Sequence, residues 1–533
     1  DQQKSQLADN KEFHQFIEDN SEWLKPYAAF SHLRDLYNTP DFSQWKLYQT
    51  VSWEDILEIC DESDEHYQHV EIHYFIQYHA HLQLLAATEY ARQNGLILKG
   101  DLPIGVYRYS CDAWINPHLY NMIGQAGAPP DAFAVTGQNW GFPTYNWEEM
   151  AKDGYQWWKK RFEKLATYFD ALRIDHILGF FRIWEIPYEQ IEGLLGVFRP
   201  ALPITVKELH EKGIYLEYNR LVKPYIRAHF LGEIFAEKTN WVKDNLLDDW
   251  GNGVYSLKFQ VNTQREAEAF LKKAVANDEE RAFIQKGIFQ LINEVLFIDS
   301  QGGFHPRISI QSSRSFQELD TDTRQKVENL YYDYFYYRHN EFWQAQAMKK
   351  LPNLVNATNM LICGEDLGMI PATVPAVMKE LNILSLEIQR MPKGDGEFGH
   401  PDNAPMLSVV SPSSHDMSTI RGWWEEDAAG TQRFFNQILH NQGYAPFFCE
   451  PWICKQIIEQ HLYSPAMWAV FPLQDLLALD ANLRRSNPKE EQINVPANPK
   501  HYWQYRLHLN LEELLEAGEL NGSLKDLVSA AGR

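Results

Sequence analysis

Three acidic residues of this 533-residue chain follow short apolar segments: Asp175, Glu365 and Asp416. Asp175 comes directly after residues 172–174. Arg173, two positions earlier on the same expected strand, points to the same face. A neighbouring guanidinium favours the ionised carboxylate, which is the state that a nucleophile needs. Because a structural ion pair at a strand end would have the same spacing, the pattern leaves both interpretations open.

Glu365 ends the apolar segment 360–364 and is followed by a second acid, Asp366. Two adjacent carboxyl groups in a poorly solvated place repel each other, which raises the pKa of one of them. A carboxyl group with a raised pKa can donate a proton, so we expect a general acid here. The alternative is that Glu365 or Asp366 caps the next helix.

Asp416 belongs to a loop rich in Ser and Pro that follows the apolar segment 406–410, and His415 precedes it. A His-Asp pair is common and carries little information by itself. At the end of a further strand, such a carboxylate could accept hydrogen bonds from sugar hydroxyls and stabilise positive charge at a reacting carbon.

The elements that must position these acids are short strands separated by helical sequence. Apolar segments at 96–98, 172–174, 360–364 and 406–410 each lead to an acid, and the first of these acids is Asp101. This pattern predicts the α/β class and a (β/α)8 TIM-type barrel, with its site at the carboxyl ends of the strands. A doubly wound open sheet is the competing fold. No glycine fingerprint for phosphate follows any of these strands, which argues against its nucleotide-binding form.

The alternation of strands and helices breaks between Asp175 and Glu365. We interpret 1–187 as the first part of the barrel, 188–340 as a mostly helical insertion, and 341–533 as the remainder of the barrel. If the two acids share a site, the insertion must bulge away from the barrel as a lobe of its own.

The insertion contains five tyrosines between residues 331 and 337. They cannot all face one buried helical stripe, because successive residues of a helix lie about 100° apart around its axis. Some of them should line a groove or a subunit contact. The alternative is that they pack the lobe against the barrel.

The overall charge excludes some classes of partner. Acidic residues outnumber basic ones, 72 against 49, and the net charge of −23 disfavours nucleic acid and anionic membrane surfaces as partners. No apolar run is long enough to cross a bilayer. The five cysteines are scattered without zinc-ligand spacing, which favours a reducing compartment. We therefore predict a cytoplasmic protein that needs neither a metal nor a cofactor.

Taken in order, several segments resemble the amylomaltase, or disproportionating-enzyme, family of 4-α-glucanotransferases. Each segment is weak evidence alone, and their order makes the resemblance specific. The segments are Gly100-Asp101-Leu102-Pro103-Ile104, Ser110-Cys111-Asp112-Ala113-Trp114, Gly127-Ala128-Pro129-Pro130-Asp131, Thr136-Gly137-Gln138-Asn139-Trp140-Gly141, Arg173-Ile174-Asp175-His176, Glu365-Asp366-Leu367-Gly368, Ser414-His415-Asp416 and Trp468-Ala469-Val470-Phe471-Pro472-Leu473-Gln474-Asp475.

The resemblance implies roles for eight residues at the matching positions. Three would be catalytic: Asp175 as nucleophile, Glu365 as general acid/base and Asp416 as stabiliser of the transition state. Five would contact the sugar: Arg173, His415 and Asp101 around the reacting unit, and Trp140 and Gln138 in a loop along the glucan.

The resemblance also implies an activity. Glucosyl or glucan units of maltose or malto-oligosaccharides would pass to glycogen or a starch-like glucan by a retaining double displacement. The same three acids would serve an α-glucan hydrolase, and a non-catalytic glucan-binding fragment is the alternative from a different class. A homo-oligomer is an option that the sequence leaves open.

Departures from the family pattern indicate a subtype. Ile177-Leu178 follows the Asp-His pair where Phe-Arg is usual, and Met417 stands where Asn is usual. Together with the insertion, they resemble the second type of disproportionating enzyme, which uses maltose as donor and a large or branched glucan as acceptor. That type carries starch-binding modules ahead of its barrel. We expect those modules and the first barrel strands to be missing from this chain, which would leave sheet edges unpaired.

Overall fold

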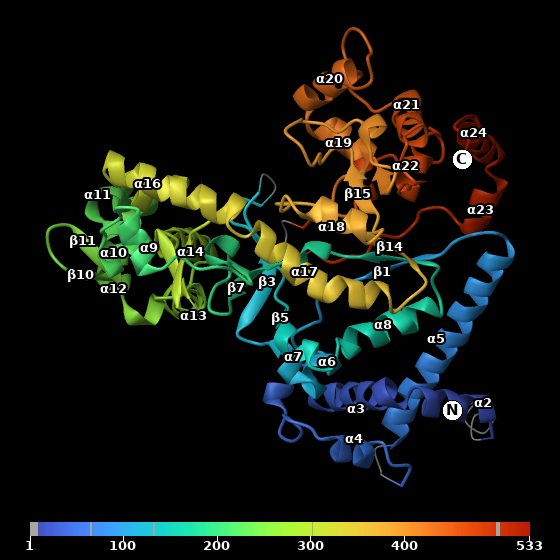
Figure 1. Ribbon diagram of the computed structural model, residues 1–533, viewed down its shortest axis with the longest axis horizontal. Coiled ribbons are helices and arrows are strands. Elements are labelled where there is room, and N and C mark those ends of the chain that lie inside the picture. The colour runs from blue at the N-terminus through green and yellow to red at the C-terminus, as the bar shows by residue number, and fades with distance from the viewer. Residues whose placement is uncertain (1–8, 64–66, 132–133, 301, 497–500) are drawn as a thin grey trace.

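The computed structural model describes residues 9–63, 67–131, 134–300, 302–496 and 501–533. The fold is mixed α/β. In Figure 1 the N-terminal helices lie at the bottom and a group of parallel strands lies near the centre. The lobe that carries helices α9 to α16 lies to the left, and helices α19 to α22 lie at the top.

Six parallel strands form the central sheet of the described chain. They run in the order in which they occur along the chain, and hydrogen bonds between Leu384 and both Ile362 and Gly364 join the first three to the last three. This order has no reversal, in contrast to a doubly wound sheet. The strands are β1 (Lys99–Leu102), β6 (Ala171–Ile174), β14 (Leu361–Gly364), β15 (Ser385–Ile388), β16 (Ser408–Ser411) and β17 (Trp468–Ala469).

Three of the four predicted strands lie within a few residues of their expected positions, as β6, β14 and β16. The prediction at 96–98 is wrong, because the strand there begins at Lys99, and the side chains of Leu96 and Ile97 are 59% and 61% exposed. Apolar residues at that place do not mark a buried strand. The sequence did not predict β15 or the two-residue β17.

The two edge strands of this sheet come close together. Among the described residues, β1 pairs only with β6 and β17 only with β16. The ammonium group of Lys99 on β1 nevertheless lies 5.9 Å from the ring centroid of Trp468 on β17. The sheet must therefore curve so that its first and last strands face each other, as in a barrel. Closure by eight strands stays a prediction.

The core beneath the site is rich in aromatic side chains. Trp158 on α8 (Gln156–Ala166) is fully buried, and its ring lies 5.1 Å from Phe180 and 6.1 Å from Trp147. Helix α17 (Asn340–Val355), which leads from the lobe back to β14, packs against α8. Residues of α8 and α17 share this core with residues of β6 and β14.

The region 188–340 contains helices and also short strands. Strand β8 (Val197–Arg199) pairs with β7 (Ile183–Pro187), so the start of the region is tied to a sheet that begins before residue 188. A separate hydrophobic core spans Ile226 to Ile292. The main helices are α11 (Ala228–Phe235), α12 (Thr239–Leu246), α13 (Gln264–Ala274), α14 (Asp278–Ile292) and α16 (Thr321–Tyr332), and a hairpin of β10 (Leu247–Asp249) and β11 (Val254–Leu257) adds to them.

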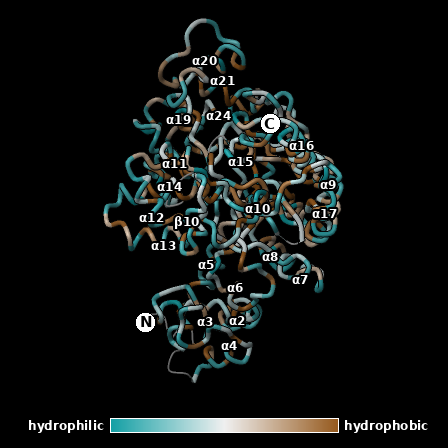
Figure 2. Tube along the Cα trace, turned by 90° about the vertical axis from the view of Figure 1, so that its left-hand side faces the viewer, coloured by the Kyte–Doolittle hydropathy of each residue, from teal (hydrophilic) through white to brown (hydrophobic). Residues whose placement is uncertain are grey.

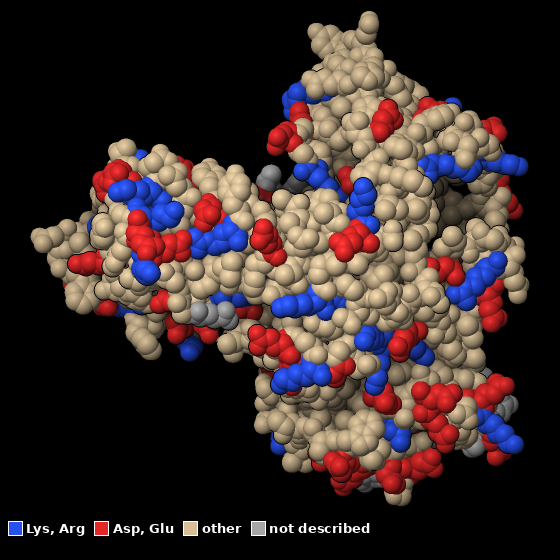
Figure 3. All heavy atoms as spheres, viewed as in Figure 1, with Lys and Arg blue, Asp and Glu red and all other residues tan. Residues whose placement is uncertain are grey.

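The N-terminal helices form a part with a core of its own. They are α2 (Lys11–Asp19), α3 (Ser21–Tyr37), α4 (Trp53–Ile59) and the long α5 (Tyr67–Gln93), which runs toward β1. Figure 2, turned by 90°, again places α2, α3 and α4 below the rest of the molecule. Acidic side chains gather over these helices at the bottom of Figure 3. No described helix is both long and apolar enough to be a membrane span.

A buried ion pair joins the segment after β17 to the helix that follows β16. Glu491 and Arg421, on α19 (Ile420–Glu426), are 3% and 5% exposed, and the carboxylate of Glu491 also accepts a hydrogen bond of 3.0 Å from the hydroxyl of Thr419. This segment continues to Asn494, whose side chain donates to Asp416 over 2.7 Å.

Replacing Glu491 should therefore destabilise the protein. We expect Glu491→Ala to lower the free energy of unfolding by about 3 to 5 kcal/mol, because the guanidinium of Arg421 would be left buried without its anion. Urea unfolding measures the loss. Glu490→Ala is the matched control, because Glu490 is exposed beside Arg485 and its removal should cost less than about 1 kcal/mol. Equal losses in the two variants would contradict this account.

Candidate active site

A large cavity of about 1610 Å³ opens at the carboxyl ends of the parallel strands. The ends of β1, β6, β14, β15 and β16 contribute to its wall, and the loop around Gly137 and part of the lobe complete it. All eight residues that the sequence predicts for the site line this one cavity: Asp101, Gln138, Trp140, Arg173, Asp175, Glu365, His415 and Asp416.

Arg173 joins two acids from neighbouring strands. In the parallel register Asp101 on β1 lies opposite Arg173 on β6, whose guanidinium lies 2.8 Å from a carboxylate oxygen of Asp101 and 2.9 Å from one of Asp175. Burial raises the pKa of Asp175 above its usual value, while Arg173 lowers it. The pKa stays above its usual value, so Arg173 offsets the effect of burial only in part, and the ion pair is compatible with both sequence interpretations.

Glu365 is attached to the end of β6 through backbone and side chain. Its amide donates to the carbonyl of Ile174 over 2.9 Å. Its two carboxylate oxygens accept hydrogen bonds from the amides of Leu367, at 3.0 Å, and His176, at 2.9 Å. Burial, followed by the nearby charge of Asp175, raises the pKa of Glu365 to about 7. A large fraction of this carboxyl group therefore carries a proton near neutral pH.

The neighbouring acid Asp366 plays a different part from the one expected. Its buried carboxylate accepts from the ammonium of Lys393 at 2.7 Å and from the amide of Leu386 at 2.9 Å. The charge that raises the pKa of Glu365 is that of Asp175, so the expected repulsion between Glu365 and Asp366 is the wrong cause. The helix-cap alternative is also wrong, because the N-cap of the next helix, α18 (Val374–Glu380), is Thr373, well after both acids.

His176 lies between the nucleophile candidate and the loop with Trp140. Its backbone is in the left-handed region, with φ of 42°, which directs its amide toward Glu365. The two rings of Trp140 and His176 meet edge to face at 5.0 Å, and the indole of Trp140 donates to the side chain of Gln138 over 3.1 Å. Burial, followed by the charge of Arg182, lowers the pKa of His176 to about 3. The imidazole is therefore neutral.

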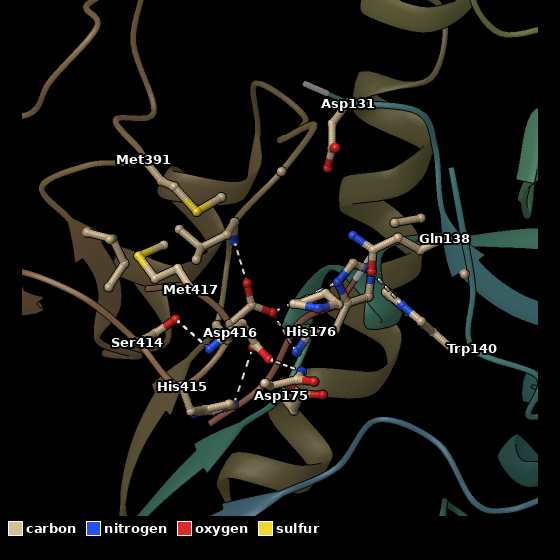
Figure 4. Close-up of a pocket in the computed structure, with 18 of the residues that line it drawn as sticks. Asp131, Gln138, Trp140, Asp175, His176, Met391, Ser414, His415, Asp416 and Met417 are labelled. Carbon is tan, nitrogen blue, oxygen red and sulfur yellow. Dashed lines mark hydrogen bonds and ion pairs between the residues drawn. The ribbon is translucent and has the colours of Figure 1, made fainter. Parts of the chain in front are cut away.

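Asp416 lies on the other side of Asp175 (Figure 4). Its carboxylate lies 3.2 Å from the ring nitrogen of His415 and accepts a hydrogen bond of 2.7 Å from the side chain of Asn494. Burial alone would raise the pKa of Asp416, but the bonds from His415 and Asn494 lower it below its usual value. This carboxylate is ionised and held in place.

The sequence analysis did not predict His176 or Asn494 as members of the site. His176 follows Asp175 directly, yet its contribution depends on an unusual backbone conformation that no residue pattern indicates. Asn494 comes from an irregular segment far along the chain. In the part of the chain that the structure describes, no group of three or more His, Cys, Asp or Glu side chains is arranged to hold a metal ion.

The arrangement suits acid-assisted displacement at a sugar. Glu365 holds a proton near pH 7, and Asp175 is paired with a guanidinium. Asp416 is held beside them by a hydrogen bond, and all three acids follow parallel strands. Paired carboxylates whose surroundings separate their pKa values are typical of enzymes that cleave glycosidic bonds.

Comparisons with known proteins agree with this class. A family model described as 4-alpha-glucanotransferase matches residues 1–511, and the chain belongs to that family. It is 43% identical over 538 residues to the 4-alpha-glucanotransferase DPE2 of Oryza sativa subsp. japonica, covering all of this chain and 57% of the rice protein. It is 23% identical to the 4-alpha-glucanotransferase of Chlamydia muridarum, covering 98% of this chain and 72% of that protein. The chain thus spans little more than half the length of its rice relative.

Two solved structures share the fold. The amylomaltase of Streptococcus agalactiae, solved in complex with acarbose, has a TM-score of 0.60 at 16% identity, covering all of this chain and 79% of that one. The amylomaltase of Corynebacterium glutamicum has a TM-score of 0.52 at 14% identity, covering 98% of this chain and 56% of that one. Their likeness supports a TIM-type α/β fold for the chain.

The raised pKa of Glu365 predicts a pH-dependent loss of stability. The folded protein keeps this proton up to pH about 7, while the unfolded chain releases it near 4.5, so stability falls as pH rises between these values. From pH 5 to pH 8 the wild type should lose about 2 to 3 kcal/mol of unfolding free energy more than Glu365→Gln. Urea unfolding at both pH values measures this difference, and parallel pH dependences of the two proteins would show that the pKa is ordinary.

Proposed function

We propose that the protein is a 4-α-glucanotransferase that transfers glucosyl or glucan units with retention of configuration. The observation that carries this proposal is the attachment of Glu365 beside Asp175, which gives a protonated acid and a carboxylate nucleophile in one cavity. Membership of the 4-alpha-glucanotransferase family supports it independently.

The reaction follows from the positions of these groups. Glu365 donates its proton to the glycosidic oxygen while Asp175 attacks the anomeric carbon, which releases the leaving sugar and forms a glucosyl-enzyme ester. The ionised Glu365 then takes a proton from an acceptor hydroxyl, whose oxygen displaces Asp175. Asp416, held by His415 and Asn494, stabilises the positive charge that develops at the reacting carbon.

The remaining predicted residues would hold the sugars. Arg173 and Asp101 flank the nucleophile and would orient the unit that reacts. Trp140 and Gln138, joined by a hydrogen bond, would contact the glucan on the other side of His176. We propose maltose or malto-oligosaccharides as donors and a glycogen-like or starch-like glucan as acceptor.

The larger organisation is part of the same proposal. We infer an eight-stranded TIM-type barrel to which the six described parallel strands contribute, with 1–187 and 341–533 belonging to the barrel and 188–340 forming the insertion. A cytoplasmic location and assembly into a homo-oligomer stay predictions.

Product analysis tests transfer against hydrolysis. The full-length protein incubated with maltotriose should yield glucose together with oligosaccharides longer than the substrate, while the number of reducing ends stays constant. Chromatography of the products and a reducing-end assay measure both quantities. A reducing-end count that rises with every cleavage would identify a hydrolase instead.

Replacing Asp416 tests its role in the transition state. Asp416→Asn should lower turnover by a factor of about 10² to 10³, the scale of losing one preorganised electrostatic contact, and should leave the circular dichroism spectrum unchanged. Asp402→Asn is the control, because Asp402 is exposed beside His400 and outside the cavity wall. Near-normal turnover of Asp416→Asn would refute the role.

A further inference from the structure

The tyrosine-rich end of helix α16 divides into a buried and an exposed set. The helix continues after Tyr332 into a single π-helical turn, η8 (Asp333–Tyr337). Tyr331 and Tyr334 are buried there. Tyr332, Tyr336 and Tyr337 are 48%, 48% and 70% exposed. The expectation that a single buried stripe could not hold all five is confirmed.

The buried tyrosines hold the lobe together. The hydroxyl of Tyr331 accepts a hydrogen bond of 3.2 Å from the amide of Ser309, and the hydroxyl of Tyr334 is hydrogen-bonded to the ring of His305 at 2.6 Å. Both rings also belong to the hydrophobic core that contains Leu172 of β6 and Ile362 of β14, so these two residues agree with the alternative of packing the lobe against the sheet. Tyr332 also contacts the core, because its ring lies 5.7 Å from that of the buried Tyr331. Packing does not account for Tyr336, which is half exposed and lines the cavity.

Two of the exposed rings form a pair: Tyr336 is part of the wall of the catalytic cavity, and Tyr332 lies beside it, outside that wall. Tyr336 lines the same cavity as Asp175 and Glu365. Its ring centroid lies 6.0 Å from that of Tyr332, with 32° between the ring planes, because residues four apart on a helix share a face. Tyr337, the most exposed tyrosine of the turn, is not part of the cavity wall.

The backbone that carries this pair is held in place. The amide of Arg338 donates to the carbonyl of Asp333 over 2.9 Å and closes the π-turn. The guanidinium of Arg338 also contacts the carboxylates of Asp333, at 2.7 Å, and Glu208. A platform whose backbone is fixed before binding loses little conformational entropy when a ligand arrives. Isolated π-turns within helices occur frequently at functional sites.

A series of contacts links η8 to the loop that follows Glu365. The loop after Glu365 contacts the lobe through Arg182, whose guanidinium donates to the carbonyl of Met369 and lies 3.9 Å from the ring of Phe198. That ring in turn lies 6.3 Å from Phe335, the neighbour of Tyr336. Figure 4 places Ser414, His415 and Asp416 on one side of Asp175, and Trp140 and Gln138 on the other.

This arrangement assigns a side of the reaction to the tyrosines. In the proposed reaction Asp416 binds the hydroxyls of the donor sugar, and Glu365 lies at the glycosidic bond that is cleaved. The space beyond Glu365 then holds the leaving sugar and, after it, the acceptor. The contacts of Arg182, Phe198 and Phe335 link η8 to the loop that follows Glu365.

We propose that Tyr332 and Tyr336 form an aromatic platform for the acceptor, which binds units of an α-1,4-glucan chain beyond the one that receives the glucosyl group. The platform rests on the proposed function. Phenol rings offer an apolar face to the C–H groups of a pyranose and a hydroxyl to its oxygens, and they carry no charge at neutral pH. A neutral oligosaccharide that emerges from the cavity fits this surface.

The test compares a short acceptor with a long one. Glucosyl transfer from maltose is measured in the full-length protein with labelled glucose and with maltoheptaose as acceptors. Tyr336→Ala and Tyr332→Ala should raise KM for maltoheptaose by about fivefold to tenfold, because one aromatic contact is lost, and should leave kcat/KM for glucose within about twofold. Tyr336→Phe keeps the ring and should stay within about twofold of the wild type.

Tyr337→Ala is the matched control and should change neither acceptor. The platform is overturned if Tyr336→Ala leaves maltoheptaose transfer unchanged, if it impairs both acceptors equally, or if Tyr337→Ala has the same effect. Absence of transfer by the wild type would overturn the proposed function instead. Calorimetric titration would then measure the affinity of each protein for maltoheptaose. Equal affinities of the wild type and Tyr336→Ala would refute the platform.

Discussion

The pairing of β6 with β14 is the constraint on which the site depends. In the parallel register Ile174 lies opposite Gly364, so the next residue of each strand, Asp175 and Glu365, emerges at the same end of the sheet. The amide of Glu365 donates to the carbonyl of Ile174, and the amide of His176 donates back to the carboxylate of Glu365. The proposed acid Glu365 is thus held at the end of β6, beside Asp175, by one bond from its own amide and one to its carboxylate.

The surroundings of each carboxyl group determine its pKa. Asp175 faces a guanidinium, whereas Glu365 is buried and receives only backbone amides, so its pKa rises to about 7. The two bonds to Asp416 have the opposite effect and lower its pKa. Three acids in one cavity can therefore have different functions because their neighbours differ.

The sequence predicts the strands that carry the three acids, because apolar runs before an acid are visible in a single chain. It misplaces the first strand, since Leu96 and Ile97 are apolar but exposed. It misses β17, which is only two residues long and whose pairing depends on β16. The contributions of His176 and Asn494 depend on a backbone angle and on a contact between distant segments. The raised pKa of Glu365 is predictable, but its second cause, Asp175, is not adjacent in sequence.

The hydrogen bonds that join the ends of β6 and β14 also bear on how long the connecting lobe can be. The hydrogen bond from His176 to Glu365 closes a loop of 189 residues. The entropy lost on closing a long loop grows only with the logarithm of its length, so doubling the loop costs about 0.6 kcal/mol. A change in the length of the lobe therefore adds little to the entropy cost of closing this loop, and the lobe can vary in size while Asp175 and Glu365 keep their positions.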